Sequence, residues 1–145
     1  MPQPQFSEAT LRSLTSGQSF SRGQEYFHSG AVVELERRGD TLLAHVEGSG
    51  YEPYQVTVKL DAGGIVEAEC TCPYDWGGYC KHIVATLLAY IHRPEQVTER
   101  PAITTLLADL DRETLIDLVT DLVDKHPHLA DWLEAEAAIL NMEIR

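Results

Sequence analysis

The sequence has no long hydrophobic run. The longest, residues 83–91, includes Thr86 and is less than half of the roughly 20 apolar residues that a membrane-spanning helix needs. The first twenty residues also lack the basic start and apolar core of a secretory signal. We therefore expect a cytoplasmic protein without membrane contact. Its 145 residues, 43% of them hydrophobic, are typical of one ordinary globular domain.

Basic side chains are scarce. The chain holds 11 Lys and Arg against 23 Asp and Glu, which gives a formal net charge of −12. Residues 101–145 alone contain three basic and ten acidic residues. A nucleic-acid-binding protein usually presents a basic stripe to the phosphate backbone. The charge balance therefore disfavours nucleic acid as a partner and confines any such role to the first two thirds of the chain.

Cysteine is scarce as well, and its placement is informative. The only three cysteines, Cys70, Cys72 and Cys80, lie within eleven residues of one another. An odd and tightly spaced set is a poor disulfide framework. Together with His82 the cysteines form a CxC pair, a seven-residue loop and a CxH pair. Metal ligation is the better explanation of this pattern.

The hydrophobic pattern predicts an α+β fold. Helical signals over residues 7–29 indicate two short N-terminal helices. From residue 31 the apolar period changes to two, and glycine-rich turns separate four alternating segments that end at Cys70. This pattern predicts a four-stranded antiparallel sheet built from two hairpins. Pro73, Gly77 and Gly78 then make the segment between the cysteine pairs a loop.

The rest of the chain has helical spacing. The apolar positions in residues 81–92 predict a helix that covers one face of the sheet and ends before Pro94. From Pro101 the pattern is helical throughout, with an amphipathic helix that ends at His126 and a last helix over about 129–141. These helices form an acidic C-terminal extension.

The segment 93–101, RPEQVTERP, is the best candidate for a joint between parts of the chain. Two prolines and four charges in nine residues suit an exposed connection. We therefore predict a first part, residues 1–93, with the N-terminal helices, the sheet and the metal site, and an acidic helical extension, residues 94–145. We expect the two parts to pack as one globular unit.

The four metal-ligand candidates suit zinc. Residues two apart at the end of a strand project from one face, so Cys70 and Cys72 can reach the same ion. Cys80 and His82 stand at the start of the following helix. Three thiolates and an imidazole are typical of a closed, tetrahedral and therefore structural Zn²⁺ site. The helix N-terminus and Lys81 should favour the thiolate forms.

Four other interpretations remain open from the residues alone. The cysteines and His82 could be ordinary core residues, Cys70 and Cys72 could form a strained disulfide, or Cys80 and His82 could be a catalytic pair. A hydrolase that uses a zinc-bound water is the fourth. We favour structural zinc because every cysteine of the chain falls in the motif and free thiols at CxC spacing have no packing rationale.

The motif, with a hairpin before it and a helix after it, resembles the SWIM-type zinc finger, and CTCP and CKHIVA are similar to bacterial members in particular. The resemblance covers about residues 20–92, including GQEYFHSGAV at 23–32. It implies that the four residues of the motif are zinc ligands. It also implies DNA binding or protein–protein interaction, since the family occurs in Mutator-type transposases and beside helicase-like ATPases of the Swi/Snf class.

Aromatic and basic side chains near the motif are the candidates for partner binding. Tyr74, Trp76 and Tyr79 could anchor a partner or stack on bases, or they could pack over the metal as a lid. Basic side chains could contact phosphate, or could simply pair with nearby glutamates. These basic residues are Arg22, Arg37, Arg38, Lys59 and Lys81.

The acidic extension also allows two interpretations, because it could dock a basic partner or finish the core with its leucines. On balance the sequence predicts a non-catalytic, zinc-binding recognition domain. We expect a protein partner, with a helicase-like ATPase as one candidate, and no small-molecule substrate. A DNA-binding module that uses the basic residues near the finger is the alternative.

Overall fold

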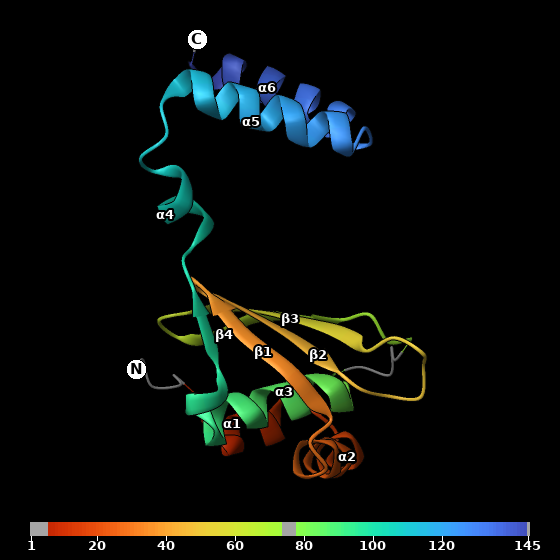
Figure 1. Ribbon diagram of the computed structural model, residues 1–145. Helices are drawn as coiled ribbons and strands as arrows, with labels where there is room; N and C mark the ends of the chain where they lie inside the picture. The colour runs from red at the N-terminus through yellow and green to blue at the C-terminus, as the bar shows by residue number, and fades with distance from the viewer. Residues whose placement is uncertain (1–5, 74–77, 145) are drawn as a thin grey trace. The chain divides into compact units, whose positions relative to one another are not determined.

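The computed structural model describes residues 6–73 and 78–144 (Figure 1). Tyr74 and Trp76, two of the predicted partner-binding residues, lie outside the described residues. The chain divides into two compact units, Met1–Ile103 and Thr104–Arg145.

The first unit is built on a five-stranded sheet with the strand order β4-β3-β2-β1-β5. The first four strands form an antiparallel meander, and β5 pairs with β1 in parallel. The tight turn between β1 and β2 needs Gly39, whose φ of 59° lies in the left-handed region that glycine tolerates. The strands are β1 (Val32–Arg38), β2 (Thr41–Val46), β3 (Tyr54–Asp61), β4 (Gly64–Cys70) and β5 (Thr98–Arg100).

Helices cover one face of this sheet (Figure 1). They are α1 (Glu8–Ser13), α2 (Gly17–His28) and α3 (Lys81–His92), and a short 3-10 turn, η1 (Pro94–Gln96), follows α3. Every residue of α3 from His82 to Tyr90 is buried, so α3 is the centre of the core. The strands contribute alternate side chains to the same core, as the period-two pattern predicts. Those of β2 and β3 are Leu42, Ala44, Val46, Val56, Val58 and Leu60.

Helices α2 and α3 approach each other closely at Gly23. A Cβ atom at this position would lie 2.4 Å from Cγ1 of Val84, a distance that no real packing allows. The Gly23→Ala variant should therefore lose about 1–3 kcal/mol of unfolding free energy through overpacking, although alanine is the better helix former. Urea unfolding of the zinc-loaded chain measures the loss. Gly17→Ala is the matched control, because nothing lies within 4 Å of a Cβ there; equal stability of the two variants would contradict the packing argument.

The fifth strand corrects the sequence prediction, which counted four antiparallel strands and took residues 93–101 as an exposed connection. Strand β5 is held at the edge of β1: Nη1 of Arg38 donates to the carbonyl of Pro101 at 2.8 Å, and Nε of Arg100 lies 3.1 Å from a carboxylate oxygen of Glu36. Three exposed residues are too few to show a period of two, so the pattern gives no signal. Residues 94–103 consequently belong to the first unit.

The second unit is helical. It contains α5 (Arg112–Lys125) and α6 (Leu129–Ile144), and α4 (Ile103–Leu107) starts at the last residue of the first unit. Asp111 caps α5, because its Oδ1 accepts a hydrogen bond from the amide of Thr114 at 2.8 Å. No helix among the described residues is long and apolar enough to cross a membrane. That the two parts pack as one globular unit stays a prediction.

Candidate metal centre

The end of β4 holds the first cysteine pair. Cys70 is the last residue of β4 and pairs with Val56 of β3. The ladder continues one residue further, because the amide of Thr71 donates to the carbonyl of Gln55 at 3.1 Å and the amide of Gln55 donates to the Thr71 hydroxyl at 3.0 Å. These bonds hold Thr71 beside β3 just beyond the end of β4, where residues 71–73 form a bend. Cys70 and Cys72 therefore come together at this bend, and not along a continued strand as the spacing predicted.

The second pair is positioned by helix α3 and by the connection between α1 and α2. Cys80 is the N-cap of α3, in an extended conformation, and His82 lies in the first turn. Two hydrogen bonds to its backbone hold Tyr79, the residue before Cys80. The amide of Tyr79 donates to the carbonyl of Leu14 at 3.3 Å, and the hydroxyl of Thr15 donates to the carbonyl of Tyr79 at 2.7 Å.

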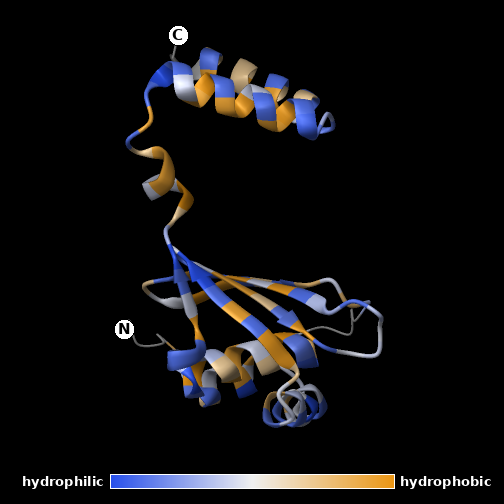
Figure 2. Ribbon diagram, in the orientation of Figure 1, coloured by the Kyte–Doolittle hydropathy of each residue, from blue (hydrophilic) through white to orange (hydrophobic). Residues whose placement is uncertain are grey.

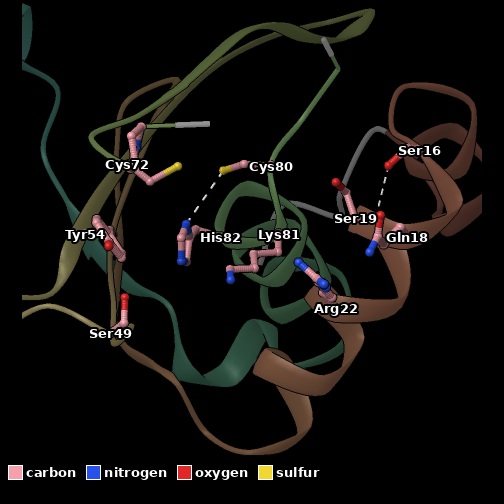
Figure 3. A pocket seen from close by; sticks show the side chains of 11 residues that line it. Ser16, Gln18, Ser19, Arg22, Ser49, Tyr54, Cys72, Cys80, Lys81 and His82 are labelled. Atoms are coloured by element: carbon pink, nitrogen blue, oxygen red, sulfur yellow. Dashed lines mark hydrogen bonds between the residues drawn. The ribbon is translucent and has the colours of Figure 1, made fainter. Parts of the chain in front are cut away.

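These elements bring all four predicted ligands together. The Sγ atoms of Cys70, Cys72 and Cys80 and a ring nitrogen of His82 all lie within 4.8 Å of one another. Figure 3 shows Cys72, Cys80 and His82 pointing toward one another. None of the three cysteines is in a disulfide, so the strained Cys70–Cys72 bond is not formed.

The distances fit a zinc ion. Nδ1 of His82 lies 3.7 Å from Sγ of Cys70 and 3.8 Å from Sγ of Cys80. With Zn–S of about 2.3 Å and Zn–N of about 2.0 Å, a tetrahedral ion separates sulfur from nitrogen by about 3.5 Å. The ligand set therefore fits zinc in both chemistry and spacing. Because Nδ1 faces the sulfurs, it is the ring nitrogen that is placed to bind the ion.

The imidazole of His82 is held by aromatic packing. The ring of Tyr54 lies 4.4 Å from it between centroids, and the ring of Tyr26 lies 5.3 Å away in an edge-on arrangement. His82 is only 4% exposed, and its buried Nε2 has no hydrogen-bond partner among the described residues. A ligating histidine is usually oriented by a hydrogen bond from its other nitrogen. Here the two tyrosine rings supply the orientation.

The thiols share their protons unequally. Cys80 has a pKa lowered to about 4, chiefly because the Cys70 side chain donates a hydrogen bond to its sulfur, with a further contribution from His82. The same hydrogen bond raises the pKa of Cys70 well above its ordinary value, and burial raises it further. In the metal-free chain Cys80 is therefore the thiolate at neutral pH, and Cys70 keeps its proton.

Zinc binding should consequently release protons. An ion that enters the site must displace at least the Cys70 proton, so the apparent affinity should fall about tenfold for each pH unit of acidification and for each proton displaced. A pH-indicator dye in weak buffer, with zinc added to the metal-free chain, measures the release. The reverse titration with a chelator should take the protons up again. Zinc binding without proton release at pH 7 would show that the thiols are already ionised.

The predicted partner-binding residues are dispersed. Tyr79 is half-buried and packs against the core. Nζ of Lys81 lies 5.0 Å from the ring centre of Tyr26. Arg37 donates to the Tyr90 hydroxyl and lies 3.4 Å from Asp40, whereas Arg38 donates to a backbone carbonyl.

A pocket of 630 Å³ opens beside the metal site. Its lining includes Cys72, Cys80 and His82, together with the cations Arg22 and Lys81 (Figure 3). No ion pair among the described residues involves either cation. A zinc ion with three thiolates and a neutral imidazole carries a net charge of −1, which these cations offset.

Sequence reasoning missed the side chains that support the ligands. Tyr54 reads as an ordinary strand residue and Tyr26 as part of a helix face, so nothing in their spacing connects them with His82. Thr15, which holds the loop, is 64 residues from its partner Tyr79. Only the folded chain brings these residues to the site.

Comparison with known proteins gives the same result as the geometry. The family model of the SWIM zinc finger matches residues 54–91, which run from β3 to the last turn of α3. The chain carries a SWIM zinc finger. The zinc finger SWIM domain-containing protein 8 homolog of Drosophila melanogaster is 31% identical over 114 residues. That match covers 78% of this chain but 5% of the relative. No solved structure matches the chain.

The SWIM finger thus includes two strands of the sheet, both cysteine pairs and the core helix up to its penultimate residue. Zinc binding by this protein follows from the family match and from the Cys₃His cluster together. The particular similarity to bacterial members stays a prediction.

Proposed function

We propose that Cys70, Cys72, Cys80 and His82 hold one structural zinc ion and that the protein is a non-catalytic recognition domain. The supporting observation is the convergence of four protein donors within 4.8 Å. A catalytic zinc keeps one position for water, whereas four protein ligands fill the tetrahedral sphere. This ligand set therefore argues against the hydrolase interpretation.

The partner we propose is a protein, and the role is that of a cytoplasmic adaptor. The supporting observation is that three basic side chains of the sheet are paired with carboxylates. Arg37 pairs with Asp40, Lys59 with Glu67 and Arg100 with Glu36. Such pairs leave little positive charge for a phosphate backbone. A helicase-like ATPase is the partner class that the SWIM resemblance suggests.

DNA binding is the second candidate, and one observation favours it. Arg22 and Lys81 line the same pocket beside the zinc ligands and belong to none of the ion pairs of the described residues. Two neighbouring cations could contact one phosphate. Their number is small, and the net negative charge of the zinc–thiolate centre offsets them.

Two measurements on the zinc-loaded full chain separate these candidates. In the first, fluorescence anisotropy follows labelled duplex and single-stranded DNA between about 50 and 200 mM salt, where phosphate-dominated binding falls by several decades. We expect no binding at the lower salt. Binding that disappears with salt and in the Arg22→Gln/Lys81→Gln variant would establish the DNA alternative.

In the second, the tagged chain is used to capture proteins from extracts of its own cells, with and without nuclease. We expect a protein that stays bound after nuclease treatment and that reassembles with the chain when both are purified. Recovery of the partner only while nucleic acid is intact would contradict the adaptor proposal.

A further inference from the structure

The second unit exposes an unusual amount of apolar surface. Helices α5 and α6 are joined by three residues, 126–128, and run antiparallel as a helical hairpin (Figure 1). None of the side chains described in residues 104–142 is buried. In Figure 2 hydrophobic residues recur along both helices. The exposed large hydrophobic residues of these two helices are Ile116, Leu118, Val119, Leu122, Trp132, Ile139, Leu140 and Met142.

These residues form stripes at helical spacing. On α5, Leu115, Leu118 and Leu122 recur three and four residues apart, whereas Asp117, Asp121 and Asp124 follow the same spacing on the opposite side. Leu115 is half-buried, but Leu118 and Leu122 are 48% and 49% exposed. The hairpin therefore covers only part of its own apolar surface.

A unit of this size must bury more of its apolar surface than the second unit buries. A chain of about 40 residues rarely stabilises a core alone, and a contiguous apolar patch with a polar rim typically marks an interaction surface. Trp132, at 61% exposed, is the largest such side chain of α6. Tryptophan is among the residues that contribute most to binding energy at interfaces.

Charge indicates what covers the patch. Residues 104–145 hold ten acidic and three basic residues, a net charge of −7. On α6, Glu136 lies between Leu133 and Leu140 at the spacing of the apolar stripe; it is half-buried and belongs to no ion pair of the described residues. A carboxylate in that position attracts a cation from the partner. A second copy of the hairpin would instead add a further net charge of −7 at the interface, and the two copies would repel each other.

We propose that the α5–α6 hairpin binds an amphipathic helix of another protein, with an apolar face and Lys or Arg along its flanks. The bound helix covers the apolar stripes and places a basic side chain against Glu136. This inference rests on the proposed adaptor function, for which it names the recognition surface and the chemistry of the partner segment. The mode is that of an amphipathic helix that lays its apolar face on an apolar surface.

The test uses the zinc-loaded full chain and a designed helix of about 18 residues, or five turns, with Leu on one face and Lys elsewhere. The Trp76→Phe background leaves Trp132 as the sole tryptophan reporter. We expect a blue shift of Trp132 emission on binding. A peptide of the same composition without a continuous apolar face, and a Leu/Glu helix, should each bind at least tenfold more weakly. Equal binding of either control peptide would overturn the proposal.

Variants locate the binding surface. Leu122→Ser and Ile139→Ser should each weaken binding of the Leu/Lys helix at least tenfold, and Glu136→Lys should reduce the preference for it over the Leu/Glu helix. Val66→Ser is the matched control, because Val66 of β4 is 58% exposed but lies in the first unit. Circular dichroism checks that the helices persist. Loss of affinity in the control alone would contradict the proposed surface.

The outcome is separable from the adaptor proposal. If a captured partner binds the Leu122→Ser chain as well as the natural one, the adaptor function stands and the hairpin surface is excluded. If sedimentation shows a dimer of the chain that Leu122→Ser dissociates, the patch is covered by a second copy and the proposal is overturned. If the Leu/Lys helix binds but no protein partner exists, the adaptor function fails alone.

Discussion

Cys80→Ser should remove the zinc and most of the stability of the first unit. Cys80 is 3% exposed, it begins the core helix α3, and its sulfur is the thiolate that other donors of the site hydrogen-bond. Structural zinc contributes on the order of 10 kcal/mol to small peptides and less where a core exists. We expect a loss of about 5 kcal/mol, measured by urea unfolding together with metal analysis.

A chelator provides the control for this experiment. Removal of zinc from the natural chain should reproduce the loss of stability, and the same chelator should have no further effect on Cys80→Ser, because both act on one interaction. A full equivalent of zinc in the purified variant would exclude Cys80 as a required ligand.

Gly48→Ala should weaken zinc binding although Gly48 is not a ligand. A Cβ at this position would lie 2.4 Å from Cε2 of Tyr54 and 3.4 Å from Nε2 of His82. The tyrosine ring must move, and it is one of the two rings that orient the imidazole. Loss of such indirect support typically costs 10- to 100-fold in metal affinity, so we expect a decrease of about that size in competition with a chromogenic chelator.

Gly50→Ala is the matched control, because the nearest atom to its Cβ would be the carbonyl oxygen of Glu52 at an ordinary 3.6 Å. Its zinc affinity should equal that of the natural chain. If Gly48→Ala also binds zinc normally, the ring packing around His82 does not position the ligand.

The sequence predicted the site well because its signal is local. Cys70 and Cys72 are separated by one residue, as are Cys80 and His82, and strand and helix patterns on either side bring the two pairs together. The four long strands and α3 show clear periods, and the structure confirms the α+β fold that those periods predict.

The parts that sequence reasoning missed depend on contacts between distant residues. Strand β5 is too short to show a period and is held by side chains 63 and 64 residues away in the chain. Likewise, an amphipathic pattern in α5 predicts a helix but does not state whether its apolar face is covered. That the leucines of the extension finish the core therefore stays a prediction.

The position of His82 has a consequence for the lifetime of the protein. Helix α3 begins at the metal site and holds nine consecutive buried residues. Loss of the ion therefore exposes the hydrophobic core itself, and not only a helix end. Proteases cleave opened chains in preference to closed ones. Turnover of this protein should therefore rise when cells are starved of zinc.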